Sequence, residues 1–123
     1  MAYVLVVDDE DAIRRLLTRW LSDWGYEAKE AANAEEAIEI MAREPAEIML
    51  CDVMMPVHDG IWLAEQVRGR WPQTAVIMAS SAQDMETVMR MRKQGAVDYV
   101  TKPFGREMLR QALQRASERM QSS

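Results

Sequence analysis

The 123-residue chain alternates strand-like segments with segments whose apolar residues recur at helical spacing. The strand-like segments cover residues 2–7, 26–31, 48–51, 75–79 and 97–101. Each is followed by a helical pattern, which predicts five β-α units. Because the connections are short, the crossovers are right-handed and the strands are parallel. We therefore expect an α/β fold, a doubly wound (βα)5 arrangement with helices on both faces of a five-stranded parallel sheet.

Capping residues mark the ends of several predicted helices. Gly25 follows the first helix, Asn33 and Glu36 form a capping-box-like start to the second, and Gly95 follows a helix over 84–94. In the first helix the predicted inward stripe consists of Ile13, Leu16, Leu17, Trp20, Leu21 and Trp24. In the third, Ile61, Ala64 and Val67 point inward and Trp62 points outward.

Charge and apolar run lengths exclude several classes of protein. The net charge of −5 disfavours nucleic acid and anionic membranes as partners of the whole chain. No apolar run is long enough to span a membrane and the N-terminus does not resemble a signal peptide, so we expect a cytoplasmic protein. Cys51 is the only cysteine, which excludes an internal disulfide. Residues 1–85 carry a net charge of −9 and residues 86–123 a net charge of +4.

Polar side chains follow four of the predicted strands. Asp8 and Asp9 follow the first, Asp52 the third, Ser80 the fourth and Lys102 the fifth. In open parallel sheets, ligands bind outside the carboxyl ends of the strands. The sequence therefore predicts a functional site made of these residues.

The three aspartates restrict the chemistry of this site. If the first and third strands are neighbours, Asp8, Asp9 and Asp52 lie about 5 Å apart. A like-charge pair at that distance costs about 3 kcal/mol at an effective dielectric constant near 20, so protonation or a bound cation must relieve the repulsion. Oxygen ligands favour a hard ion such as Mg²⁺. With a hydroxyl from Ser80 and a cation from Lys102, the set suits phosphoryl transfer with an aspartate as nucleophile.

The motifs in this order resemble the receiver domain of bacterial two-component response regulators. The resemblance covers the whole chain and rests on four groups of residues. They are Asp8-Asp9, Asp52 with Met55-Pro56 and Asp59-Gly60, Ser80 after Val76–Ala79, and Tyr99–Phe104, which includes Lys102-Pro103. The resemblance implies a flavodoxin-like sheet with strand order 2-1-3-4-5.

Carried over by position, the resemblance assigns roles to single residues. Asp52 accepts the phosphoryl group, Lys102 and Ser80 contact it, and Ser80 and Tyr99 act as the switch. The implied Mg²⁺ ligands are Asp9, Asp52 and the backbone carbonyl of Met54, with Asp8 acting partly through water. The bond between Lys102 and Pro103 is implied to be cis. Three positions depart from the family pattern: Ser80 replaces the commoner threonine, Ser81 a small apolar residue, and Trp62 a residue that is more often polar.

The implied partners are a sensor histidine kinase or a phosphotransfer protein. Output would pass through the surface of the helix over 84–94, the fifth strand and the last helix, which also offers a homodimer interface. We expect residues 1–121 to form one receiver domain, residues 122–123 to form a tail or the start of a linker, and an output domain to be possible. No turnover of an external substrate is expected, so the chain is not predicted to be an enzyme.

Two other functions compete with the switch. A small aspartate-nucleophile phosphatase fits poorly, because Met54 stands where such enzymes carry a second acid two residues after the nucleophile. A receiver-like interaction module without phosphorylation has the same fold, and failure to bind Mg²⁺ would favour it. The single His58, close to Asp52 in sequence, is most simply an exposed loop residue.

Overall fold

The computed structural model describes residues 3–81, 86, 89–90, 93 and 98–121. Five parallel strands form one sheet in the order β2-β1-β3-β4-β5, which confirms the predicted fold class and strand order. The strands are β1 (Val4–Val7), β2 (Ala28–Ala31), β3 (Ile48–Asp52), β4 (Ala75–Ser81) and β5 (Asp98–Lys102).

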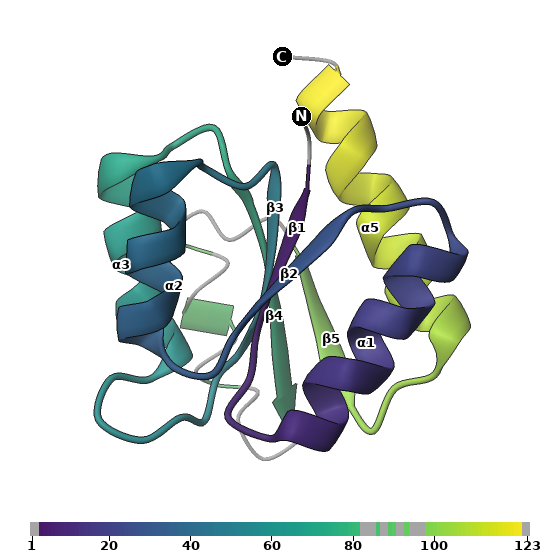
Figure 1. Cartoon of the computed structure of the whole chain (residues 1–123), viewed down its shortest axis with the longest axis horizontal. Coiled ribbons are helices and arrows are strands. Elements are labelled where there is room, and N and C mark those ends of the chain that lie inside the picture. The colour runs from purple at the N-terminus through teal and green to yellow at the C-terminus, as the bar shows by residue number, and fades with distance from the viewer. Residues whose placement is uncertain (1–2, 82–85, 87–88, 91–92, 94–97, 122–123) are drawn as a thin grey trace.

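Helices cover both faces of this sheet (Figure 1). Helices α1 (Asp11–Asp23) and α5 (Arg106–Gln121) lie on one face, and α2 (Ala34–Arg43) and α3 (Gly60–Arg70) lie on the other. The helix expected over 84–94, its capping Gly95 and the tail 122–123 lie wholly or mostly outside the described residues. Within the described ranges, no helix combines the length and the apolar character that crossing a membrane requires.

The sheet separates two hydrophobic clusters because β1, β3 and β4 are buried on both sides. In β1, Leu5 and Val7 belong to the cluster under α2 and α3, while Val4 and Val6 belong to the cluster under α1 and α5. All four residues are buried. This alternation explains why β1 is a continuous apolar run, since each face needs its own apolar residues.

Local backbone interactions place the ends of the elements close to the predicted ones. Gly25 has a positive φ of 88°, which ends α1 as expected. The N–H of Tyr26 donates to the carbonyl of Leu21 at 2.9 Å, so the chain is still leaving the helix there and β2 begins only at residue 28. Asn33 Oδ1 accepts from the N–H of Glu36 at 2.9 Å, which confirms the predicted cap.

The last two strands extend further toward the carboxyl edge than the sequence predicted. Ser80 pairs with Thr101 and Ser81 with Lys102, so these side chains stand on strands and not on the loops that follow. Strand pairing restricts the backbone more tightly than a loop does. The functional side chains at this edge are therefore held by the sheet itself.

The predicted inward stripe of α1 is wrong at one position. Leu17 and Leu21 are buried, as expected, but 42% of Leu16 is exposed. The apolar stripe of this helix is wider than the face that the sheet covers. Leu16 instead faces a groove that is described below.

Candidate functional site

The carboxyl ends of β1 and β3 bring two aspartates together. Val7 pairs with Cys51 in the parallel register, and each strand continues into an aspartate, Asp8 after Val7 and Asp52 after Cys51. Only 2% of Asp8 and 7% of Asp52 is exposed, although both are acidic. Carboxylates are rarely buried to this extent without a partner.

Lys102 is the partner of both carboxylates. Its Nζ lies 3.2 Å from Asp52 Oδ1 and 3.4 Å from Asp8 Oδ2, across the edge of the sheet from β5. One ammonium thus serves two carboxylates, and the group as a whole retains a negative charge. The three residues are widely separated in sequence, and the fold brings them together at the carboxyl edge of the sheet.

Burial and neighbouring charges raise the pKa values of both Asp52 and Lys102. Burial raises the pKa of Asp52, and the attraction of Lys102 offsets only part of that increase. For Lys102, burial alone would lower the pKa, but Asp52 and Asp8 together raise it above its ordinary value. The lysine therefore stays cationic at neutral pH, beside a carboxylate that is costly to keep ionised. The neighbouring thiol of Cys51 is fully buried, and this burial raises its pKa so far that it remains protonated and unreactive.

The raised pKa of Asp52 predicts how the stability of the metal-free protein depends on pH. The unfolded chain releases the Asp52 proton at a lower pH than the folded chain does, so stability falls as pH rises from the usual aspartate pKa to the raised one. Asp52→Asn removes this cost. At pH 7 in a chelating buffer the variant should melt about 2–6 °C higher than wild type. Thermal unfolding near pH 4 should show a smaller gain, and an equal gain at both pH values would contradict the argument.

The main chain around Asp8 is held by hydrogen bonds from three directions. Its N–H donates to the carbonyl of Ala31 at 3.2 Å, and Asp8 Oδ1 accepts from the N–H of Glu10 at 2.9 Å. Arg14 Nη1 donates to the carbonyl of Asp8 at 2.6 Å, and the same guanidinium pairs with Glu30 at 3.2 Å. Arg14 therefore fixes the acidic turn to α1 and β2. The sequence does not indicate this role of Arg14, because an arginine in a helix carries no signal of its partners.

The acidic turn supplies oxygen ligands for a cation. The carboxylates of Asp8, Asp9 and Glu10 lie within 4.8 Å of one another, and Asp9 and Glu10 are exposed. Glu10 was not among the predicted ligands. Asp52, a predicted ligand, does not belong to this cluster, and the N–H of Met54 donates to its Oδ1 at 3.4 Å. An all-oxygen set with surplus negative charge has the chemistry that Mg²⁺ requires.

Ser80 has a buried hydroxyl group without a hydrogen-bond partner among the described residues. Only 1% of this residue is exposed, and among the residues that the structure describes its Oγ is buried without a hydrogen bond. It follows Ala79, which pairs with Asp52 across β3 and β4. An unpartnered buried hydroxyl is costly, so a ligand oxygen beside Asp52 would stabilise it. Tyr99, the other predicted switch residue, is half-buried on β5 against the cluster under α2 and α3.

The loop between β3 and α3 closes tightly behind Asp52. The N–H of Gly60 donates to the carbonyl of Val53 at 2.9 Å, and a Cβ on Gly60 would lie 2.2 Å from the Asp52 carbonyl oxygen. Asp59 Oδ1 accepts from the N–H of Trp62 at 2.9 Å and caps α3. The Asp59-Gly60 motif therefore sets the backbone on which Asp52 stands. On the opposite side of the site, the peptide bond between Lys102 and Pro103 is cis, as the resemblance implied.

Trp62 does not point outward as the sequence predicted. Its side chain is half-buried, packs against the cluster under α2 and α3, and stacks on His58 with ring centroids 3.9 Å apart. The prediction failed because the apolar spacing within α3 carries no information about the preceding loop, whose His58 covers the Trp62 ring. His58 is half-buried and stacks on Trp62, so it is not simply the exposed loop residue that the sequence indicated.

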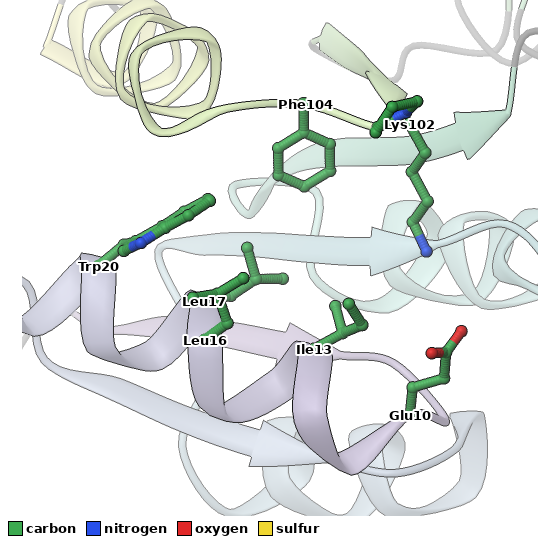
Figure 2. A pocket seen from close by; sticks show the side chains of 8 residues that line it. Glu10, Ile13, Leu16, Leu17, Trp20, Lys102 and Phe104 are labelled. Carbon is green, nitrogen blue, oxygen red and sulfur yellow. The ribbon is translucent and has the colours of Figure 1, made fainter.

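An apolar groove adjoins the site between α1 and the segment that follows β5 (Figure 2). Its volume is about 440 Å³, with Glu10 and Lys102 at the end near the site. Its apolar lining consists of Ile13, Leu16, Leu17, Trp20, Pro103 and Phe104.

Arg106, the first residue of α5, contacts α1 and the residue after it beside the groove. Its guanidinium carbon lies 5.9 Å from the ring centroid of Trp20 and 5.7 Å from that of Trp24, and Nη2 lies 3.3 Å from Asp23 Oδ2. The start of α5 is thereby joined to α1 beside the groove.

Comparison with known proteins identifies the family. Residues 4–114 match the model of the response regulator receiver domain. A putative NtrX-like response regulator of Rickettsia felis is 37% identical over 117 residues, which are 94% of this chain and 25% of that protein. The chain thus spans about a quarter of the length of this curated relative.

Solved structures agree with the sequence match. The receiver domain of NtrX from Brucella abortus superposes with a TM-score of 0.90 at 32% identity, covering 94% of this chain and 98% of that one. The chemotaxis protein CheY4 of Vibrio cholerae gives 0.87 at 33% identity with the same coverage. With the converging aspartates, lysine and serine already described, these matches show that the chain belongs to the response regulator receiver domain family.

Proposed function

We propose that this chain is a phosphorylation-dependent switch of a two-component system and that Asp52 accepts its phosphoryl group. The observation that carries the proposal is the buried Asp52 carboxylate, 3.2 Å from the Lys102 ammonium and next to the strand that bears the unpartnered hydroxyl of Ser80. A nucleophile, a cation and a hydrogen-bond donor at one place are what phosphoryl transfer to a carboxylate needs.

The proposed donor is a phosphohistidine on a sensor kinase or a phosphotransfer protein. A carboxylate oxygen of Asp52 attacks the phosphorus, and the bond between phosphorus and the imidazole nitrogen breaks. The nitrogen keeps the electron pair, and Asp52 becomes an acyl phosphate. Lys102 then exchanges its contact with the Asp52 carboxylate for one with a phosphoryl oxygen, and the Ser80 hydroxyl donates to another.

The same residues suit a bound Mg²⁺. Asp9, Asp52 and the carbonyl of Met54 would hold the ion, with Asp8 acting partly through water, and Glu10 would add a further carboxylate beside Asp8 and Asp9. When bound, the ion neutralises negative charge on the phosphoryl oxygens and on the carboxylates. Asp8 remains paired with Lys102 on the other side of the site.

Labelling of the wild-type chain tests the proposal directly. Incubation with acetyl phosphate and Mg²⁺ should add one phosphoryl group, which intact-mass spectrometry detects. Replacing Mg²⁺ with a chelator should reduce the labelled fraction at least tenfold, since the attacking and transferred groups are both anionic. A chain that gains no mass under either condition would instead be a receiver-like interaction module without phosphorylation.

The acyl phosphate would act on the rest of the fold through Ser80 and Tyr99. It adds negative charge and acceptor oxygens beside Ser80, and Tyr99 stands on the neighbouring strand β5. We expect the change to reach β5 and α5, the described part of the output surface that the sequence predicts, where a homodimer or an output domain can respond. In this function the chain promotes its own phosphorylation and dephosphorylation in the cytoplasm and turns over no external substrate.

The groove between α1 and the segment after β5 is the proposed docking site of the phosphodonor protein. It is apolar and ends at Lys102, so a helix seated in it would stand beside Asp52. Trp20 and Phe104 give it the aromatic lining that is common at protein interfaces (Figure 2).

Leu16 allows docking to be separated from chemistry. Leu16→Glu places a charge in the groove at a position that is 42% exposed, so the cost in folding stability is small. With a sensor kinase that labels wild type, transfer should fall about tenfold, the loss that about 1.4 kcal/mol of interface energy gives. Labelling by acetyl phosphate should stay within about twofold of wild type. Met108→Glu on α5, where the methionine is 47% exposed, is the matched control and should leave both rates unchanged.

A further inference from the structure

The loop between β3 and α3 contains a strained turn. The N–H of His58 donates to the carbonyl of Pro56 at 2.9 Å, and Val57 between them has a positive φ of 70°. A hydrogen bond between residues i and i+2 around a positive φ is the rare and strained form of the γ-turn. For a β-branched residue this conformation is especially unfavourable. Val57 is 90% exposed, so burial of its own side chain does not offset the strain.

The side chain of His58 holds the end of this turn. Its ring stacks on Trp62 of α3 with centroids 3.9 Å apart and an interplanar angle of 15°. On its other side, Nε2 lies 3.7 Å from Glu35 Oε1 in the first turn of α2. The main chain of Trp62 donates its N–H to Asp59 Oδ1, and its side chain packs against the cluster under α2 and α3. The imidazole therefore joins the loop to α3 and lies close to the start of α2.

The strained turn lies close in sequence to Met54, a largely exposed residue of the site. Met54 is 66% exposed, and its N–H makes only a long hydrogen bond of 3.4 Å to Asp52. The loop is closed by the hydrogen bond of 2.9 Å from the N–H of Gly60 to the carbonyl of Val53. Within the loop, Met55 packs into the core and His58 stacks on Trp62. Two residues separate Met54 from Val57, so the turn constrains the main-chain path that leads away from Met54.

We propose that His58 is a positioning residue for the divalent cation: its contacts with Trp62 and Glu35 hold the turn at Val57 in its strained form and so aim the Met54 carbonyl at the carboxylates of the site. This inference rests on the proposed function, because it concerns the same cation. It assigns His58 no contact with the phosphoryl group. It predicts that cation affinity depends on a ring at position 58 and on the residue at position 57.

Calorimetric titration with Mg²⁺ alone tests this inference on the whole chain. His58→Ala should weaken binding about tenfold, the lower end of what residues that orient metal ligands contribute. His58→Phe keeps a flat ring on Trp62 and should stay within about threefold of wild type. Val57→Gly should bind as wild type does, since glycine adopts a positive φ without strain. In the double variant, where the turn needs no restraint, the loss caused by His58→Ala should shrink to less than about twofold.

Amide hydrogen exchange followed by NMR gives a second readout that needs no metal. The His58 amide, which is bonded to Pro56, should exchange at least tenfold faster in Trp62→Ala than in wild type, and the Trp62→Phe variant should keep most of the protection. Equal Mg²⁺ affinity in wild type and His58→Ala would overturn the inference and leave the proposed function intact. An undiminished loss in the Val57→Gly background would overturn it as well, because the effect would not pass through the turn. If wild type itself binds no Mg²⁺, the proposed function fails too.

Discussion

Asp52→Asn is expected to abolish phosphorylation. The variant keeps the size of the side chain and removes the anionic oxygen that attacks phosphorus. Asp8 also contacts Lys102, but among the described residues Asp52 is the only carboxylate that has this contact and also pairs with the strand that bears Ser80. Losing a nucleophile typically costs several powers of ten in rate. After acetyl phosphate treatment, intact-mass spectrometry should show the unmodified mass alone.

Asp59→Asn is the matched control for this experiment. Asp59 is an aspartate of the same loop, but its carboxylate caps α3, and asparagine caps helices equally well. Labelling of this variant should resemble that of wild type. Mass gain in Asp52→Asn equal to that of wild type would move the nucleophile to another residue and refute the assignment of Asp52.

Gly60→Ala is expected to be the most destabilising single substitution near the site. Its Cβ would lie 2.2 Å from the Asp52 carbonyl oxygen and 2.9 Å from Met78 Cε, and the first of these atoms belongs to the backbone of a central strand. Strand β3 cannot move without breaking its pairing with β1 and β4. We expect a loss of about 3 kcal/mol or more in the free energy of unfolding, measured by urea denaturation.

Gly69→Ala on the same helix isolates the steric effect. A Cβ at Gly69 meets nothing within 4 Å, and alanine favours helix over glycine by about 0.5–1 kcal/mol. This variant should be as stable as wild type or slightly more so. If both substitutions had equal effects, the close approach of Gly60 to Asp52 would have no energetic consequence.

The sequence predicted the architecture well because burial on both faces leaves a clear pattern. The continuous apolar residues of β1 and β3, each ending at an aspartate, follow directly from a sheet covered on both sides. The strand order, in contrast, came only from the family resemblance, since apolar runs do not specify their neighbours. That order is what sets Asp8 beside Asp52.

The parts that the sequence missed depend on contacts and coverage that no periodic pattern encodes. Arg14 reaches the carbonyl of Asp8, and His58 stacks on Trp62, but neither side chain belongs to a pattern with a recognisable period. Leu16 fits the inward stripe of α1 and is nevertheless exposed, because helical periodicity does not show how wide the covered face is. Glu10 belongs to the carboxylate cluster because of the conformation of the turn after β1, whereas the sequence pattern there indicates only the start of a helix.

The separation of the core into two clusters has a practical consequence for spectroscopy. Trp20 and Trp24 pack against the cluster under α1 and α5, whereas Trp62 and Trp71 pack against the cluster under α2 and α3. The intrinsic tryptophan fluorescence therefore comes from two pairs of indoles on opposite faces of the sheet. With phenylalanine at all but one of these positions, the remaining indole becomes an optical probe for one layer, and Trp62 in particular reports on the loop behind Asp52 through its stacked imidazole.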